Sequence, residues 1–317
     1  MYRNLRRLAP LVASAALVLS ACAPGSAEEA PAGPAAAGPT TTGPTATKQA
    51  SPPAPVIDVA DELGRLEGKY HAVVGLYAMD TGDGTRVAHR ADDRFAFAST
   101  FKALAAGAVL ERSSADELAR VVTYDAADLV EYSPVTEQHV GTGMTMLEII
   151  DAAVQVSDNT AGNLLLDALD GPSGLQDALR AVGDETTVSA RYEPELNDVT
   201  PGDDRDTSTA RALAGDLRAY ALGDVLDDAG RKTLVEALKG STTGNETIRA
   251  GVPDGWDVGN KTGTSGNGGR NDIGVLWPPD GEPIVLAILT RTEDPDAEPD
   301  DDLLAEATAV AMEALTR

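Results

Sequence analysis

Ser99 and Lys102 stand one helical turn apart, at the start of an apolar stretch (Ser-Thr-Phe-Lys). Residues three apart lie on the same face of a helix, so the lysine amine can receive or polarise the proton of the serine hydroxyl. The positive end of the helix would also favour negative charge that develops at the serine oxygen. By itself the pattern is weak, because Ser-x-x-Lys is expected about once by chance in a chain of this length. A serine that caps a helix, followed by a surface lysine, has the same sequence.

Two rarer motifs follow the first one along the chain. They are Ser-Asp-Asn at residues 157–159 and Lys-Thr-Gly at residues 261–263. Each tripeptide is expected by chance roughly 0.05 times per chain. The three motifs in this order resemble the signature of class A β-lactamases and penicillin-binding proteins.

The segment 191–197 (Arg-Tyr-Glu-Pro-Glu-Leu-Asn), followed by Arg-Asp-Thr at 205–207, is the most specific part of the resemblance. It is similar to the Ω-loop of class A β-lactamases. The resemblance also includes residues 128–134 and covers nearly all of 56–317. It implies that Arg191 and Asp206 pair at the neck of this loop, and that Asn163 holds the loop's backbone.

The resemblance implies a role for each residue that opens a β-lactam ring. Ser99 is the acyl acceptor, with Lys102 as its neighbouring amine or ammonium. Ser157 relays a proton to the departing lactam nitrogen. Glu193 and Asn197 hold the water that cleaves the acyl-enzyme. Whether Glu193 or Lys102 takes the serine proton during acylation stays open.

The substrate carboxylate needs a cationic anchor, which the resemblance places on two neighbouring strands. Lys261 supplies a fixed positive charge. Thr262, Thr264 and Arg270 are expected to bind the carboxylate itself. The full set of expected substrate-binding residues is Tyr132, Asn159, Lys261, Thr262, Gly263, Thr264 and Arg270.

The remainder of the substrate is expected to contact the opposite side of the site. Asn159 would hold the substrate's amide side chain, and Tyr132 would form one wall. Backbone N–H groups of Ser99 and Thr264 would form the oxyanion hole, where one donor can be worth ~3 kcal/mol. Ser265 stands where many penicillinases have glycine, which favours activity on cephalosporins as well as penicillins.

Two other functions use similar residues. A penicillin-binding D,D-peptidase or β-lactam sensor shares the serine, the lysine and Lys-Thr-Gly, but lacks the pair of Glu193 and Asn197. A carboxylate next to the acyl ester turns a slow acyl carrier into a hydrolase. A lipid-anchored binding or adhesion protein with relic residues would lack at least one of Ser99, Lys102 and Glu193, and all are present.

The net charge and the histidine positions of the chain limit the ligands and partners that it can bind. The 317 residues include 25 Lys+Arg and 51 Asp+Glu, a formal net charge of −26, which argues against nucleic-acid binding. His71, His89 and His139 are too far apart for a His-x-His or His-x-x-x-His zinc pattern, so a metallo-β-lactamase is excluded. We expect no metal, no organic cofactor, small β-lactams as substrates, and a monomer.

The N-terminal residues are typical of an exported lipoprotein. Basic residues precede an apolar stretch at 8–19, and Leu-Ser-Ala-Cys at 19–22 resembles the bacterial lipobox. We therefore expect a signal peptide at 1–21, acylation of Cys22, and a disordered Ala/Pro/Thr-rich tether at 22–55. No apolar run reaches the roughly 18 residues of a membrane span. The lipid would be the membrane contact of a protein that acts outside the cytoplasmic membrane, either anchored or in part released.

Periodicity in 56–317 predicts strands near both ends and helices between them. Helices are expected at 56–67, 101–112, 145–156, 160–170, 175–182, 207–222, 228–238 and 300–315. Strands are expected at 71–79, 85–89, 256–260, 272–277 and 284–290. This order predicts an α/β fold of the α+β type, β-lactamase/transpeptidase-like. It would have about five antiparallel strands flanked by helices, an all-α lobe, and the active site between them.

Overall fold

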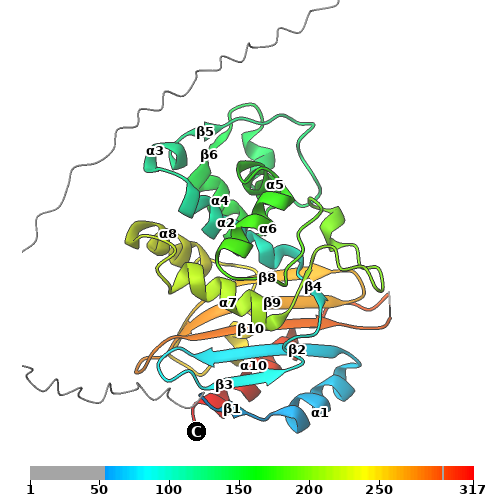
Figure 1. The fold of residues 1–317 in the computed structure, drawn as a ribbon. Helices are drawn as coiled ribbons and strands as arrows, with labels where there is room; N and C mark the ends of the chain where they lie inside the picture. Colours follow the sequence, from blue (N-terminus) through cyan, green and yellow to red (C-terminus); the bar gives the residue numbers. More distant parts are fainter. Residues whose placement is uncertain (1–53, 295) are drawn as a thin grey trace, which may run out of the picture. The chain divides into compact units, whose positions relative to one another are not determined.

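A central six-stranded sheet lies between two groups of helices (Figure 1). The computed structural model describes residues 54–294 and 296–317. In spatial order the strands are β1 (Val56–Ile57), β3 (Arg86–His89), β2 (Val73–Asp80), β10 (Ile284–Arg291), β9 (Gly269–Trp277) and β8 (Asp257–Ser265). Strands β2, β9 and β10 have long runs of buried residues, as expected for a sheet covered on both faces. Strand β8 lies at an edge, so the backbone groups on its outer side have no neighbouring strand.

The predicted fold class is confirmed, with differences at the ends of elements. Within the described ranges, five strands pair antiparallel, and β1 adds a short parallel pair with β3. The sequence analysis placed a helix from residue 56, which is wrong for the first residues: β-branched Val56 and Ile57 pair with β3, and helix α1 begins at Ala60. Strands β8 and β9 are also longer than predicted. Their Gly, Asn and Asp residues have low strand propensity, but cross-strand pairing from Asp257 to Ser265 keeps them extended.

One face of the sheet carries most of the helices. They are α2 (Phe101–Arg112), α4 (Met146–Gln155), α5 (Asn159–Ala168), α6 (Pro172–Ala181), α7 (Ala210–Ala221) and α8 (Asp228–Lys239). Helix α2 lies at their centre: every residue from Phe101 to Leu110 is buried. Gly107 allows the close approach of α7, because a Cβ atom there would lie 2.6 Å from the ring of Tyr220. The core on this side therefore fixes the helix that begins just after Ser99.

The opposite face carries α1 (Ala60–Tyr70), α9 (Ile248–Gly251) and α10 (Asp301–Leu315) (Figure 1). Their apolar residues pack with Val74, Leu76, Leu286 and Ile288 of the sheet into a second core. Shorter elements are α3 (Ala115–Leu118), β4 (Phe95–Ala96) paired with β7 (Thr207–Ser208), β5 (Val121–Val122) paired with β6 (Met144–Thr145), and 3-10 turns at Ala98–Thr100, Thr136–His139 and Glu195–Asn197. No helix in the described ranges is both long and apolar enough to cross a membrane. Cys22, the predicted signal peptide and nearly all of the predicted tether lie outside the described residues.

Candidate active site

Ser99 lies in a tight turn that runs directly into helix α2. The turn spans Ala98–Thr100, and Ala98 has φ of +47°, in the left-handed region that non-glycine residues rarely adopt. Lys102 is fully buried in the first turn of α2, and its Nζ donates a hydrogen bond of 2.8 Å to Ser99 Oγ. The spacing in the sequence thus places the two groups together, as predicted.

Lys102 Nζ lies among oxygen atoms from three other segments. It donates to the Ser157 carbonyl oxygen (2.9 Å) and to Asn159 Oδ1 (2.6 Å), and it pairs with Glu193 Oε1 at 2.9 Å. Burial lowers the pKa of Lys102, and the Glu193 carboxylate acts in the opposite direction. The amine is therefore closer to proton exchange with Ser99 than a solvated lysine would be.

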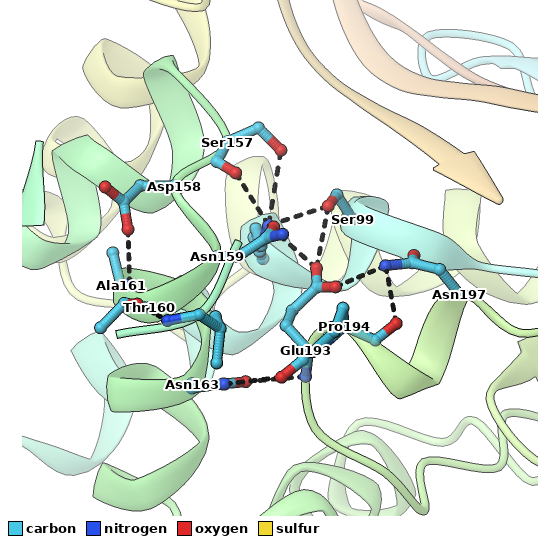
Figure 2. Close-up of polar contacts among 12 residues, drawn as sticks. Ser99, Ser157, Asp158, Asn159, Thr160, Ala161, Asn163, Glu193, Pro194 and Asn197 are labelled. Carbon is cyan, nitrogen blue, oxygen red and sulfur yellow. Dashed lines mark hydrogen bonds and ion pairs between the residues drawn. The ribbon is translucent and has the colours of Figure 1, made fainter. Parts of the chain in front are cut away.

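Glu193 is 2% exposed and is oriented at both its backbone and its side chain. Figure 2 shows its carboxylate between Ser99 and Asn197: Oε1 accepts from Ser99 Oγ (3.0 Å) and Oε2 accepts from Asn197 Nδ2 (2.5 Å). Asn163 bonds to the Glu193 backbone twice, accepting from N at 2.8 Å and donating to O at 3.0 Å. Asn197 Oδ1 is buried and has no hydrogen-bond partner among the described residues, so it is available as an acceptor.

A buried ion pair closes the neck of the loop that carries Glu193. Arg191 Nε lies 2.6 Å from Asp206 Oδ2. The other oxygen of the fully buried Asp206 accepts from the backbone N–H groups of Ala190 and Arg191, at 2.8 and 3.0 Å. The pair that the sequence analysis expected is present, and it holds both ends of the loop.

Ser157 lies between the two lysines of the site. Its Oγ accepts from Lys261 Nζ at 2.9 Å and lies 3.5 Å from Lys102 Nζ. Its φ of +63° is again left-handed. The next residue, Asp158, is buried: it caps helix α5 and accepts from the backbone and hydroxyl of Thr136. Asp158 is thus a scaffold residue that fixes the position of Ser157.

Strand β8 approaches the Ser99 turn closely because of Gly263. A Cβ atom at Gly263 would lie 3.0 Å from the Phe97 carbonyl oxygen and 3.1 Å from Ser99 N. Lys261, two residues earlier on the same side of the strand, is fully buried. Burial lowers the pKa of Lys261 well below its usual range, and the charge of Lys102 adds to the effect. Both lysines are therefore held in a low-dielectric region beside Ser99.

Arg270 lies on strand β9, and its side chain extends to the neighbouring strand β8. It is directly opposite Thr264 in the strand register, and its Nη1 donates to Thr264 Oγ1 at 3.0 Å. Its Nε pairs with Asp301 Oδ1 at 2.5 Å, and its Nη2 donates to the Thr243 carbonyl oxygen at 3.2 Å. Thr262, which lies on the same side of β8 as Thr264, is 3% exposed.

Tyr132 and Asn159 are joined through the backbone. Asn159 N donates to the Tyr132 carbonyl oxygen at 3.0 Å, and Asn159 Nδ2 donates to the Glu131 carbonyl oxygen at 2.8 Å. Tyr132 has φ of +61° and is 58% exposed, so its side chain is accessible to a ligand. No group of three or more His, Cys, Asp or Glu residues within the described part of the chain could hold a metal ion.

Comparisons with known proteins agree on one family. A family model described as "Beta-lactamase enzyme family" matches residues 58–315. The chain belongs to this family. A β-lactamase from Amycolatopsis lactamdurans is 57% identical over 266 residues, 84% of this chain and 87% of that protein. One from Bacillus licheniformis is 51% identical over 258 residues, 81% of this chain and 84% of that protein.

Solved structures of β-lactamases have the same fold. A halotolerant bacterial β-lactamase aligns with a TM-score of 0.80 and 52% identity, covering 81% of this chain and 99% of that one. The class A β-lactamase of Clostridium kluyveri DSM 555 aligns with a TM-score of 0.80 and 46% identity, covering 81% and 98%. The chain described above is therefore a class A serine β-lactamase, which hydrolyses the amide bond of β-lactams.

The structure brings together the motif residues of the β-lactamase, and it adds neighbours that the motifs did not indicate. Asp301, within the helix predicted at 300–315, pairs with Arg270. Thr243 was not singled out, yet it contacts both Arg270 and Thr262. Asp301 is the first residue of α10, Thr243 lies in the segment between α8 and α9, and both are remote from Arg270 in sequence, so no local pattern could have identified these contacts.

Asp272 lies opposite Thr262 in the register of β8 and β9, and its ionisation should affect stability. Its Oδ2 accepts from Thr247 Oγ1 (2.6 Å) and Asn260 Nδ2 (2.7 Å), whereas Oδ1 is buried with no hydrogen-bond partner in the described ranges. Burial raises the pKa of this carboxyl from 3.8 to about 6. Between these values the folded protein binds more protons than the unfolded chain, so this residue's contribution to stability falls as pH rises.

The substitution Asp272→Asn removes that dependence and places an amide N–H₂ where the unpartnered oxygen lies. From pH 4 to pH 7, the free energy of unfolding of the variant should rise relative to the parent by about 2 kcal/mol, because each pKa unit is worth 1.36 kcal/mol and part of the shift already acts below pH 4. Urea unfolding of both proteins at pH 4, 5, 6 and 7 measures the difference. A difference that stays constant with pH would contradict the assignment.

Proposed function

We propose that Ser99, Lys102, Ser157, Glu193 and Asn197 carry out β-lactam hydrolysis through an acyl-enzyme. Ser99 Oγ bonds to the lactam carbonyl carbon, and its proton passes to Lys102 or Glu193. The carbon–nitrogen bond then breaks, and the nitrogen receives a proton through Ser157 Oγ. The contact of Ser157 Oγ with Lys261 Nζ, and its proximity to Lys102 Nζ, support this relay.

Deacylation is assigned to Glu193, and the position of the Glu193 carboxylate is the main observation that supports the proposal. Its carboxylate lies 3.0 Å from Ser99 Oγ and 2.5 Å from Asn197 Nδ2, so it can take a proton from water that attacks the ester at Ser99. The available Oδ1 of Asn197 can accept the second proton of that water in a hydrogen bond. The ester C–O bond then breaks, Ser99 Oγ leaves as the hydroxyl with the proton that Glu193 took from water, and the enzyme is regenerated.

The acylation base stays one of two groups. Lys102 Nζ and Glu193 Oε1 lie 2.8 and 3.0 Å from Ser99 Oγ, so both are within proton-transfer distance. The lowered pKa of Lys102 favours a role for the amine, whereas the Glu193 carboxylate already accepts a hydrogen bond from the Ser99 hydroxyl. Separate variants of the two residues, considered in the Discussion, distinguish them.

Substrate binding is assigned to both sides of strand β8. Lys261 attracts the carboxylate of penicillins and cephalosporins, while Thr262, Thr264 and Arg270 donate hydrogen bonds to it. Gly263 leaves room for the substrate carbonyl beside the N–H groups of Ser99 and Thr264, the expected oxyanion hole. Asn159 and exposed Tyr132 contact the amide side chain of the substrate, and Ser265 supports turnover of cephalosporins.

The alternative of a D,D-peptidase or β-lactam sensor is disfavoured by Glu193 and Asn197. A protein that only stores the acyl group has no use for a buried carboxylate in contact with Ser99 and fixed by Asn163 and Asn197. The curated relatives at 57% and 51% identity are named β-lactamases. Sustained turnover, with more than one substrate consumed per enzyme, is the kinetic difference between the two functions.

We further propose that Cys22 is acylated and anchors the enzyme, as a monomer, to the outer side of the cytoplasmic membrane. The support is the Leu-Ser-Ala-Cys motif after an apolar stretch. When the full chain is expressed in a bacterium, detergent phase partitioning should place it in the detergent phase and Cys22→Ala in the aqueous phase. Aqueous partitioning of both proteins would contradict lipidation.

A further inference from the structure

Thr243 lies between helices α8 and α9 and contacts two of the residues assigned to the substrate carboxylate. Its Oγ1 is 2.7 Å from Thr262 Oγ1, and its carbonyl oxygen accepts from Arg270 Nη2 at 3.2 Å. We propose that Thr243 is a positioning residue for carboxylate recognition, which orients the hydroxyl of Thr262 and the guanidinium of Arg270. The inference rests on the proposed function of those two residues.

The donor in the hydrogen bond between the hydroxyls of Thr243 and Thr262 is defined once a substrate carboxylate is bound. Thr262 has one hydroxyl proton, and a carboxylate can only accept. When Thr262 donates to the substrate, its oxygen can still accept, and Thr243 is its side-chain hydrogen-bond partner in the described part of the chain. Thr243 O–H therefore donates to Thr262, and Thr262 O–H to the carboxylate. Hydrogen bonds in such a chain polarise and strengthen one another.

The carbonyl oxygen of Thr243 contacts Arg270, the second residue assigned to the substrate carboxylate. Arg270 uses Nε for Asp301 and Nη1 for Thr264, and Nη2 for the carbonyl of Thr243. These contacts fix the plane of the guanidinium from three sides. Because a planar guanidinium binds a carboxylate in a defined orientation, fixing the plane before binding reduces the entropy that is lost.

The segment around Thr243 is itself held on both sides. Thr242 N and Oγ1 donate to the carbonyl oxygen of Gln155, the last residue of α4, at 2.9 and 3.0 Å. On the other side, Thr247 Oγ1 donates to the buried Asp272 at 2.6 Å. Gly244 is pressed against Asn260, since a Cβ there would lie 1.9 Å from Asn260 Nδ2. Thr243 is thus presented to β8 by a fixed backbone.

The test compares Thr243→Val, which keeps the shape and the backbone carbonyl but removes the hydroxyl, with Thr243→Ser, which keeps the hydroxyl. Steady-state kinetics are measured with a penicillin and with its methyl ester, which lacks the negative charge. We expect Thr243→Val to raise KM for the free acid up to about tenfold, the upper range for one hydrogen bond between neutral groups. The kcat for the acid and the kcat/KM for the ester should change less than threefold, and Thr243→Ser should behave like the parent.

Three further variants make the outcome decisive. Thr242→Val removes the neighbouring hydroxyl but keeps the backbone bond to Gln155, and it should leave KM within twofold of the parent. Thr243→Ala replaces the valine variant if thermal unfolding shows that Thr243→Val is not folded. Arg270→Ala tests the carboxylate site directly and should reduce the preference for acid over ester.

The proposal and the function on which it rests fail in different ways. If Arg270→Ala reduces the preference for the acid but Thr243→Val does not, the positioning role of Thr243 is overturned while the carboxylate site stands. If Thr243→Val lowers kcat/KM for acid and ester by the same factor, Thr243 acts on the whole site and the proposal is also overturned. If neither variant changes the preference, the carboxylate assignment itself is wrong, and the inference falls with it.

Discussion

Replacement of Glu193 by alanine should convert the enzyme into a protein that is acylated by penicillin and is not released. The carboxylate is the group positioned to activate water against the ester at Ser99, and general base catalysis contributes typically 10²–10⁴-fold. Turnover should fall by at least that factor. Intact-protein mass spectrometry after mixing should show the variant carrying the mass of one penicillin, while the parent returns to its free mass within seconds.

Glu195 provides a matched control for this experiment. It lies two residues further along the same loop and is exposed, so Glu195→Ala removes an equal charge from the same loop without changing the contacts of Ser99. The control should turn over penicillin at close to the parent rate and show no accumulated adduct. Hydrolysis by Glu193→Ala within tenfold of the parent rate would remove Glu193 from the deacylation step.

Replacement of Lys102 by methionine should affect the step before the acyl-enzyme. Methionine fills the buried volume of the lysine but removes the amine that contacts Ser99, Asn159 and Glu193. We expect acylation to slow by about 10²–10⁴-fold, so that no adduct accumulates in the first seconds. Stopped-flow absorbance with a chromogenic cephalosporin measures the acylation rate, and thermal unfolding verifies that the variant is folded.

The two variants together identify the acylation base. If Lys102→Met acylates slowly and Glu193→Ala acylates at the parent rate, the amine takes the serine proton. If both slow acylation, the proton passes through the pair as a unit, as their 2.9 Å contact allows. Acylation by Lys102→Met at the parent rate would contradict any role for the amine and leave the carboxylate as the base.

Much of the fold is encoded in local sequence patterns. The apolar stretch at 103–110, with charged residues at both ends, predicts the bounds of α2 that the structure has, and the acidic residues before Leu303 predict the start of α10 within one residue. The prediction fails where pairing between distant segments outweighs local preference. Residues 56–57 become a strand because β3 is beside them.

The residues of the candidate site also divide into those that local sequence patterns indicate and those that only contacts between distant segments bring together. Ser99, Lys102 and Glu193 belong to motifs, and the resemblance of those motifs to class A β-lactamases implied their chemistry. Thr243 and Asp301 belong to no motif, because their importance comes from contacts with Arg270 that form only when strand β9 packs beside α9 and α10. The residues that we assign to the substrate could thus be predicted from the sequence, whereas the contacts of Thr243 and Asp301 with Arg270 required the fold.

The most direct test of hydrolysis through Ser99 is to follow a chromogenic cephalosporin at a large excess over the purified enzyme, beside the Ser99→Ala variant. The account predicts linear absorbance change over many turnovers for the parent and no enzymatic change for Ser99→Ala. A single stoichiometric burst from the parent would contradict it, because a protein that stops after one acylation does not use Glu193 to release its product.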